Sequence, residues 1–350
     1  MDISILTAEE LEKLQQAISE STHIVVCAHQ NPDGDAVGAC LGWASLLRSL
    51  GKQVGMVLPD MYPDYLRWLP QAKEIVIHDR QKDKAQQLFN AADLVFCLDF
   101  NCAERLATMG DMLLQCQAPR VMIDHHPNPD LTTVLTISHP EMCSTCELIF
   151  RIVWQMGLFD KMDGDFAATI YCGMMTDTGG FQYNSSTPDI YFIICQLLTK
   201  GIDKDKIYRN VFNNYSYDRT QLLGFVLYRR LKYVPEKGAA YFILTKGDLK
   251  RFHYIKGDLE GVVNMPLQIK GVRLSMSFRE DTEKKNKVWV SLRSVDDLSC
   301  TEIAQKHFNG GGHKNASGGK LFCEPHEVEA IALKAISELP DINQLDNKSK

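Results

Sequence analysis

Short apolar segments that alternate with helical patterns limit the fold of the first two hundred residues more than any other feature of the chain. Five segments are typical of buried strands: IVVCAH (24–29), QVGMVL (53–58), EIVIH (74–78), DLVFCLD (93–99) and RVMIDHH (120–126). Helical patterns such as AVGACLGWASLLRSLG (36–51) lie between them. Apolar strands that alternate with helices form parallel sheets with helices on both faces. The sequence therefore predicts an α/β first domain with a parallel sheet.

A second α/β pattern begins near Tyr233. Strands are predicted at AAYFILT (239–245), RLSMSFRE (273–280) and KVWVSLRS (287–294), and a closing helix at EVEAIALKAISEL (327–339). RNVFNNYSYDR (209–219) fits an amphipathic helix followed by a linker. We therefore expect a first domain over residues 1–215, a linker over 216–232 and a smaller α/β domain over 233–345.

Composition limits the compartment and the partners of the chain. The formal net charge of −6 over 350 residues argues against a broad basic face that binds duplex nucleic acid. No apolar segment reaches the length of a membrane span and no secretory signal is recognisable, so we expect a cytoplasmic protein without a membrane anchor. Cys143 and Cys146 form a C-x-x-C pair, but no second pair completes a zinc site. We expect both to pack inside a helical region.

Four segments of the first domain share one pattern, an apolar strand or helix that ends in aspartate or histidine. They are CAHQNPDGD (27–35), FCLDFN (96–101), MIDHHPNP (122–129) and GMMTDTGG (173–180). Open α/β sheets place their sites at the carboxyl ends of the strands. The segments offer eight candidate groups: His29, Asp33, Asp35, Asp99, Asp124, His125, His126 and Asp177. So many acidic groups at one edge would repel one another unless cations neutralised them.

The chemistry of this set indicates the kind of cation. Imidazole and carboxylate ligands without an obligatory thiolate suit manganese or a similar octahedral divalent ion. The number of ligands exceeds the needs of one ion that keeps positions open for water and substrate, and it fits two ions that share a carboxylate. Two such ions about 3.5–4 Å apart suit the hydrolysis of phosphoesters. We expect two divalent cations, Mn²⁺ first, with Mg²⁺ or Co²⁺ as alternatives.

The same segments, taken in order, resemble the four motifs of the DHH phosphoesterase superfamily: HQNPDGDAVGA (29–39), LDFN (98–101), IDHHPNP (123–129) and GMMTDTGGFQY (173–183). VSLRS (290–294) and FNGGGHKNASGG (308–319) resemble the DHHA1 domain of one branch. The resemblance covers nearly the whole chain. In length and layout the chain is most similar to the bifunctional oligoribonuclease and pAp phosphatase subfamily, the nanoRNases. RecJ exonucleases usually carry further domains, and family C pyrophosphatases have a second domain without GGGH.

The resemblance implies how the ligands divide between two ions. His29 and Asp33 would bind one ion, and Asp35 and His125 would bind the other. Asp99 would bridge the two ions.

The resemblance also implies roles for the remaining residues of this cluster. Asp177 would complete the site, and Asp124 would orient a histidine without binding metal. His126 would face the substrate phosphate and assist the leaving oxygen. Phe100 and Asn101 depart from the small or hydroxyl residues that are frequent after the bridging aspartate, which puts no ligand in doubt.

Candidate substrate contacts lie in both domains. Gly310, Gly311 and Gly312 precede His313, and a flexible loop or a nest of backbone N–H groups for a phosphate explains them equally well; the resemblance favours the phosphate. Arg293, at a predicted strand end, suits a phosphate or a carboxylate, although a surface ion pair is the commonest role of an arginine. Arg105, shortly after Asp99, is a weaker phosphate candidate, because a solvent-exposed helical position explains it almost as well.

The sequence thus predicts a metal-dependent phosphoesterase that hydrolyses short oligoribonucleotides or linear dinucleotides and pAp from one end, in a cleft that the DHHA1 domain closes. Cyclic-dinucleotide phosphodiesterase and short-chain exopolyphosphatase activities are alternatives. A nucleotide-binding regulator that retains the fold is a further alternative, which the complete ligand set disfavours. We expect short single-stranded RNA or small nucleotides as partners, no duplex nucleic acid and no membrane. A homodimer is left open.

Overall fold

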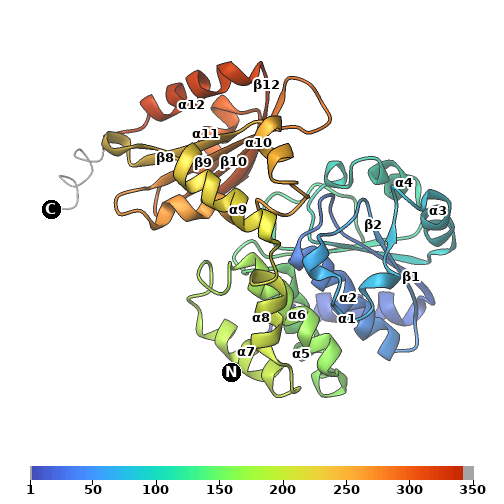
Figure 1. Cartoon of the computed structure of the whole chain (residues 1–350). Coiled ribbons are helices and arrows are strands. Elements are labelled where there is room, and N and C mark those ends of the chain that lie inside the picture. The colour runs from blue at the N-terminus through green and yellow to red at the C-terminus, as the bar shows by residue number, and fades with distance from the viewer. Residues whose placement is uncertain (1, 342–350) are drawn as a thin grey trace. The chain divides into compact units, whose positions relative to one another are not determined.

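The computed structural model describes residues 2–341 (Figure 1). The chain divides into two compact units, Met1–Asn214 and Tyr215–Lys350. Each unit has its own sheet and its own hydrophobic core. Among the described residues, no helix is long and apolar enough to cross a lipid bilayer.

The first unit is built on a six-stranded sheet in which all neighbouring strands are parallel. Its strands are β1 (His23–Cys27), β2 (Gln53–Leu58), β3 (Val76–Ile77), β4 (Leu94–Leu98), β5 (Arg120–Asp124) and β6 (Leu135–Ser138). Its α-helices are α1 (Ala8–Glu20), α2 (Gly34–Ser49), α3 (Lys82–Ala91), α4 (Met109–Gln115), α5 (Thr145–Gln155), α6 (Gly164–Asp177), α7 (Pro188–Leu198) and α8 (Lys204–Phe212). The spatial order β3-β2-β1-β4-β5-β6 reverses between β1 and β4, where open α/β sheets bind their ligands.

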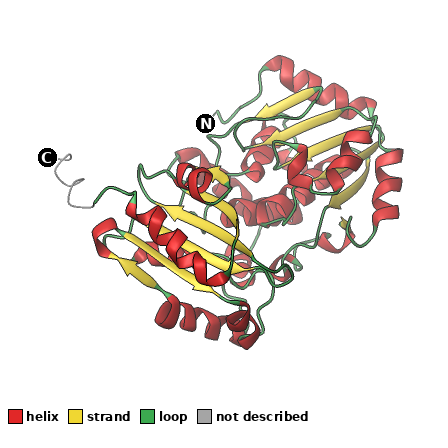
Figure 2. Ribbon diagram, turned by 90° about the horizontal axis from the view of Figure 1, so that it is seen from above, coloured by secondary structure: helices red, strands yellow, loops and turns green. Residues whose placement is uncertain are grey.

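Both faces of this sheet are buried, which explains why its strands are nearly continuous apolar runs. Ile24 and Val26 of β1 pack in the cluster that includes α1, α2, α5 and α6. Val25 and Cys27 of the same strand pack in the cluster that includes α3 and α4. Figure 2 shows helices on both sides of the strands. The prediction of a parallel sheet with helices on both faces is confirmed.

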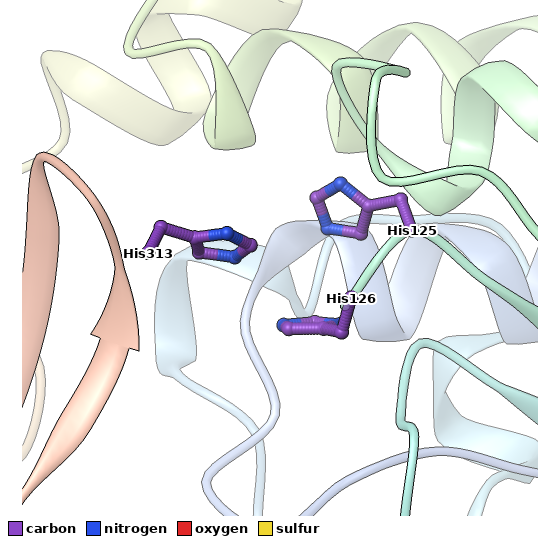
Figure 3. Close-up of side chains that lie close together, drawn as sticks. All are labelled: His125, His126 and His313. Atoms are coloured by element: carbon purple, nitrogen blue, oxygen red, sulfur yellow. The ribbon is translucent and has the colours of Figure 1, made fainter. Parts of the chain in front are cut away.

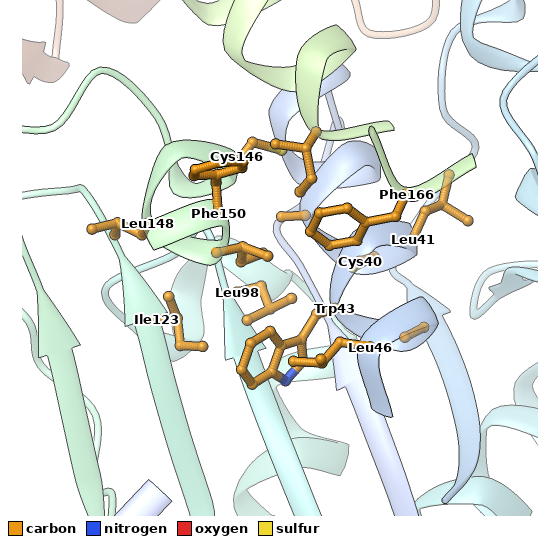
Figure 4. Packing of buried hydrophobic residues seen from close by; sticks show 14 of the residues in the cluster. Cys40, Leu41, Trp43, Leu46, Leu98, Ile123, Cys146, Leu148, Phe150 and Phe166 are labelled. Atoms are coloured by element: carbon orange, nitrogen blue, oxygen red, sulfur yellow. The ribbon is translucent and has the colours of Figure 1, made fainter. Parts of the chain in front are cut away.

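Helices α2, α5 and α6 approach one another closely because glycines lie at their contacts. A Cβ atom on Gly38 of α2 would lie 2.7 Å from the Thr169 carbonyl oxygen of α6, and one on Gly173 of α6 would lie 2.2 Å from the Cys146 sulfur of α5. Figure 4 shows part of the surrounding core, in which Cys146 lies among buried side chains. Cys143 and Cys146 are free and buried, as expected from the sequence.

The second unit has a mixed sheet in the order β11-β12-β10-β9-β8-β7, in which β8 and β9 are parallel and the other pairs antiparallel. Its strands are β7 (Lys232–Val234), β8 (Ala239–Leu244), β9 (Leu274–Glu280), β10 (Lys287–Ser294), β11 (Gly311–His313) and β12 (Ala316–Phe322). Its α-helices are α9 (Tyr217–Phe225), α10 (Lys246–Arg251), α11 (Cys300–His307) and α12 (Val328–Ser337). A π-helical turn (Val226–Arg230) follows α9, and the 3-10 helix η7 spans Val262–Gln268.

Helices cover the two faces of this sheet unequally. Helices α11 and α12 pack against β8, β9, β10 and β12 on one face. On the other face, Phe242 and Leu244 of β8 pack against residues of α9, α10 and η7. Residues 216–232, a predicted linker, contain α9 and the π-helical turn and belong to the second unit.

Several segments differ from the predicted elements, and three of them bear on the site or the sheets. EIVIH (74–78) forms only the two-residue strand β3. Strand β6 was not predicted. It has only four residues and lies at a sheet edge, where not all of its side chains are buried, so its sequence signal is weak. The glycine segment 310–319, which suggests a loop, forms the antiparallel hairpin β11–β12.

Candidate metal centre

The proposed metal ligands lie around the point where the strand order of the first sheet reverses. His29 and Asp33 follow β1, Asp35 lies in the first turn of α2, Asp99 follows β4, His125 follows β5, and Asp177 is the last residue of α6. Their ligand atoms form two groups: His29, Asp33 and Asp99, and Asp35, His125 and Asp177. Within each group the ligand atoms lie within 4.8 Å of one another.

In the first group, local hydrogen bonds orient His29 and Asp33. The His29 Nδ1 atom lies 2.8 Å from the Gln30 carbonyl oxygen, which fixes Nδ1 as a donor and turns Nε2 toward the carboxylates. Nε2 lies 3.3 Å from Asp99 Oδ2 and 3.8 Å from Asp33 Oδ2. Asp33 caps α2, because its Oδ1 accepts the N–H groups of Asp35 and Ala36. The Pro-Asp-Gly corner thus starts a helix and also presents a candidate metal ligand.

Asp99 lies between the two groups. Its Oδ2 atom faces His29, whereas its Oδ1 atom lies 3.6 Å from His125 Nε2. His125 Nε2 also lies 3.5 Å from Asp177 Oδ2, and its Nδ1 lies 3.3 Å from the Met142 carbonyl oxygen. Ligand atoms about 2.1 Å from one ion at right angles lie about 3 Å apart, so small side-chain shifts would accommodate a cation in each group.

The backbone at Asp99 is strained. Its φ angle is +62°, in the left-handed region that non-glycine residues rarely adopt, although asparagine and aspartate tolerate it best. Such strain persists where the surrounding structure enforces it and is frequent at functional sites.

The N-terminus of α5 supports two of the carboxylates and was missed by sequence reasoning. The Thr145 and Cys146 N–H groups donate to Asp35 at 2.7 and 2.9 Å, and the Thr145 hydroxyl donates to Asp99 Oδ1 at 2.9 Å. Ser144 caps the helix by accepting the Glu147 N–H. The helix cap in STCE (144–147) was the available signal, since a helix N-terminus attracts anions.

Burial and neighbouring charges shift the pKa values of the clustered side chains. Burial, with the charges of Asp99 and Asp177, raises the pKa of Asp35 well above its ordinary value. Burial also opposes ionisation of Asp99, but the hydrogen bond with His29 and the charges of nearby histidines outweigh it and hold the pKa of Asp99 well below its ordinary value. Burial disfavours protonation of His29, but Asp99 and Asp33 outweigh it and raise the pKa of His29 to about 9. A divalent cation would take the place of these protons.

Asp124 and His126 form a pair next to the candidate ligand Asp99, whose Oδ1 atom lies 3.7 Å from His126 Nδ1. Asp124 is fully buried, and its Oδ1 atom lies 2.8 Å from His126 Nδ1. Its Oδ2 atom has no hydrogen-bond partner among the described residues. The rings of His125 and His126 meet edge to face with centroids 4.7 Å apart (Figure 3). Asp124 therefore engages Nδ1 of the His126 ring.

Arg105 lies on the short 3-10 helix Ala103–Leu106 after β4, not on an α-helix. Its carbonyl oxygen accepts the Gln30 N–H at 2.7 Å, which joins the loops that follow β1 and β4. Its charge is one of the influences that lower the pKa of His29, although the aspartates outweigh it. The arginine therefore lies within electrostatic reach of the first group.

The glycines of the second unit have different structural surroundings. The Gly310 N–H donates to the Ala304 carbonyl oxygen, so in this conformation it is not available to a phosphate. A Cβ atom on Gly310 would lie 1.9 Å from the Gly318 carbonyl oxygen, whereas one on Gly311 would meet nothing within 4 Å. Gly312 has a φ angle of +141°, which favours glycine. His313 ends β11 and is exposed (Figure 3).

Arg293 of β10 and His313 of β11 both pair in register with β12. Each is the cross-strand partner of Ala316, so the two side chains point to the same face of the sheet. They are separated by one strand, or about 10 Å. The register therefore places both proposed phosphate contacts in one row.

Comparison with known proteins supplies the family. The model of the DHH family, N-terminal domain, matches residues 23–174, and that of the DHHA1 domain matches residues 238–339. The chain is 27% identical over 318 residues to the bifunctional oligoribonuclease and PAP phosphatase NrnA of Thermus thermophilus, covering 90% of this chain and 87% of that protein. It is 23% identical over 324 residues to the cyclic-di-AMP phosphodiesterase GdpP of Geobacillus thermodenitrificans, of which it covers 46%.

A solved structure agrees over almost the whole chain. The crystal structure of an exopolyphosphatase-related protein from Bacteroides fragilis superposes with a TM-score of 0.92 and 43% sequence identity, covering 95% of this chain and 97% of that one. The four ordered motifs, the parallel sheet that carries them and these matches lead to one conclusion: the chain belongs to the DHH family, in the branch with a DHHA1 domain.

Proposed function

We propose that this protein uses two divalent cations to hydrolyse short oligoribonucleotides or linear dinucleotides and pAp from one end. The observation that carries the proposal is the position of Asp99, whose two oxygens face His29 in one ligand group and His125 in the other. Cations in the two groups would polarise the phosphoester and lower the pKa of the attacking water. Manganese suits the imidazole and carboxylate ligands best, with magnesium or cobalt as alternatives.

His126 is proposed as the residue that assists the leaving oxygen. Asp124 accepts a hydrogen bond from Nδ1 of its ring, which fixes the ring's direction. Nε2 can then donate a proton or a hydrogen bond to the oxygen that leaves phosphorus. Thr145 has a positioning role, since its hydroxyl fixes the orientation of the Asp99 carboxylate.

The second unit is proposed to select the substrate through Arg293, His313 and the backbone near Gly311 and Gly312. The row shared by Arg293 and His313 supports this role, because two donors on one sheet face can bind a phosphate from two sides. Arg105 is proposed as a further phosphate contact in the first unit.

The names of the relatives support nucleotides as substrates and also supply the alternatives. The Thermus relative is an oligoribonuclease and PAP phosphatase, whereas the other two relatives are named for cyclic di-AMP and exopolyphosphatase. We prefer the first activity to that of the cyclic-di-AMP phosphodiesterase, because this chain covers 87% of the Thermus relative and only 46% of GdpP. The exopolyphosphatase activity is left for the substrate screen to distinguish. A regulator without catalysis is disfavoured, since all six candidate ligands are retained and lie in two groups that could each hold a cation.

A substrate screen tests the proposal. Purified protein with manganese is offered pAp, pApA, pGpG, cyclic di-AMP, short RNA, pyrophosphate and polyphosphate, and the products are resolved by chromatography. We expect pAp and the short linear nucleotides to be hydrolysed fastest. Preference for polyphosphate or cyclic di-AMP would replace the proposal with the corresponding alternative.

Arg293→Ala tests the role of the second unit within the same assay. The loss of a charge-assisted bidentate contact should lower kcat/KM for nucleotides by roughly thirtyfold to a thousandfold. Slow hydrolysis of p-nitrophenyl phosphate should hardly change, because that ester has no second phosphate to bind. Equal losses for both substrates would mean that Arg293 supports the fold instead.

A further inference from the structure

One face of the second sheet is covered by η7 over parts of β9 and β10 and is partly exposed over β12, and its residues form ordered rows. The register places Arg279, Trp289 and Lys320 in one row across β9, β10 and β12. The next row on the same face contains only small residues: Ser277, Ser291, Gly318 and Gly311. Arg293 and His313 lie in the row after that. The opposite face is the one that α11 and α12 cover, and the strict burial alternation of β10 separates the two faces.

The small row makes this face accessible. Each of its four residues is partly exposed, whereas Val288, Val290 and Leu292, on the opposite face of β10, are buried. Serine and glycine side chains are too short to fill the space above a strand. A flat group can therefore lie over the Gly318 and Gly311 end of this row, between the Trp289 row and the Arg293 row.

Trp289 is held in a fixed orientation. Its indole N–H donates to Asp281 at 2.9 Å, and the Lys287 ammonium lies 3.8 Å from its ring centroid. Lys287 precedes Trp289 by two residues and covers the ring from that side, while it forms an ion pair with Asp281 at 3.2 Å. Ser291, the next residue on the same face of β10, is too small to cover the ring. The hydrogen bond and the ion pair therefore hold the indole in place next to the small row.

Cations flank this aromatic ring. The exposed Lys320 has its ammonium 5.4 Å from the Trp289 ring centroid, and Arg279 lies on the opposite side of Trp289 in the same row. Phe322, two residues after Lys320 on the same face of β12, is 72% exposed. An aromatic ring between cations on an open sheet face is the arrangement that single-stranded nucleic acids bind, by stacking of bases and neutralisation of phosphates.

We propose that Trp289 stacks against a base of a single-stranded oligonucleotide, with Lys320 and Arg279 as contacts for the flanking phosphates. The proposal rests on the proposed function and deepens it, since it assigns a binding position beyond that of Arg293 and His313. Trp289 and Arg293 are four residues apart on one strand, or about 13 Å. One small nucleotide such as pAp held at Arg293 would not reach the indole, whereas a chain of several nucleotides would. Trp289 should therefore set a preference for chain length.

Length-resolved kinetics test this assignment on the full-length enzyme with manganese. Single-stranded RNAs of two to seven nucleotides and pAp are compared for wild type, Trp289→Ala and Trp289→Phe. We expect Trp289→Ala to raise KM for the longer RNAs roughly tenfold to a hundredfold, with kcat nearly unchanged, and to leave pAp hydrolysis unaffected. Trp289→Phe should restore part of the affinity, because a phenyl ring still stacks.

Substitutions inside and outside this sheet face test whether the effects on RNA binding are specific to it. Lys320→Glu should weaken binding of the longer RNAs several-fold and flatten its salt dependence. Lys334→Glu, the same change on an exposed position of α12, should have neither effect. Tyr228→Ala removes an aromatic side chain that is 81% exposed outside the sheet and should leave the length preference intact.

Fluorescence gives a readout without turnover. Trp289 is the only one of the four tryptophans that lies in the second unit, so stacking should quench emission in wild type but not in Trp289→Phe. The titration uses the full chain, an RNA pentamer and a chelator to prevent hydrolysis. If wild type hydrolyses nucleotides but Trp289→Ala keeps the same KM at every length and no quenching occurs, the stacking site is refuted. If wild type hydrolyses none of them, the proposed function fails instead.

Discussion

Two motifs stand out in the sequence: the acidic segments at the edge of the parallel sheet and the glycines of the β11–β12 hairpin. Packing explains the residue types of the second motif but not those of the first. Packing does not require Asp35 and Asp99 to be acidic; both carboxylates are almost completely buried, and unpaired charges there would be costly. Gly310, in contrast, is required by packing alone, since any Cβ atom would collide with β12. An acidic motif at a buried sheet edge therefore indicates function directly. A glycine motif indicates function only at positions where packing would also tolerate a side chain.

The largest expected effect tests the acidic side of this comparison. Asp99→Asn keeps the size of the side chain and its tolerance of positive φ but removes the charge shared by the two ligand groups. We expect turnover to fall roughly a thousandfold or more, beyond the 10- to 100-fold cost of losing an outer contact. Metal analysis should show fewer than two manganese ions per chain, with an unchanged circular dichroism spectrum. Near-normal turnover with full metal content would contradict the bridging role.

The two adjacent histidines give the next largest effect. His126→Ala should lower turnover by roughly a hundredfold to ten-thousandfold, the usual range for a general acid. Its metal content should stay close to that of wild type, because Asp124 rather than a cation is proposed to engage its Nδ1. His125→Ala is the matched variant and should lose metal. Equal metal loss in both variants would mean that His126 is a ligand too.

Thr145 tests whether the support of the carboxylates matters as well as the ligands themselves. Thr145→Val removes only the hydroxyl that donates to Asp99 and leaves the backbone donors to Asp35 in place. Manganese affinity should fall roughly tenfold to a hundredfold, and Thr145→Ser should restore it. Manganese titration followed by activity and by calorimetry measures both. Equal losses in Thr145→Ser and Thr145→Val would mean that the hydroxyl alone does not support Asp99, since serine retains that group.

The parts of this structure that were predictable follow from local rules. Strands β1, β4 and β5 end in Asp or His segments, and parallel topology brings such ends together. Thr145 was not predictable in this way, because its contacts with Asp35 and Asp99 depend on how α5 packs against α2. The hairpin β11–β12 was missed because five glycines weaken every local strand signal, and only the pairing with β10 fixes it.

The smallest expected effects concern Gly310 and Gly311. Substitutions at these two glycines separate a role in packing from a role in substrate binding. Gly310→Ala forces β12 away from the preceding turn, so we expect a loss of unfolding free energy of about 1–3 kcal/mol or more, the cost of an overpacked site. Gly311→Ala adds a methyl group where nothing lies within 4 Å, so stability should change by about 0.5 kcal/mol or less. Hydrogen exchange of the β10 and β12 amides measures both effects within the second unit. If Gly311→Ala nevertheless lowers kcat/KM for pAp while p-nitrophenyl phosphate hydrolysis is unchanged, the missing side chain at Gly311 serves the close approach of a substrate. If nucleotide hydrolysis is also unchanged, the proposed contact at Gly311 is excluded, and the proposed phosphate contacts of the second unit reduce to Gly312, His313 and Arg293.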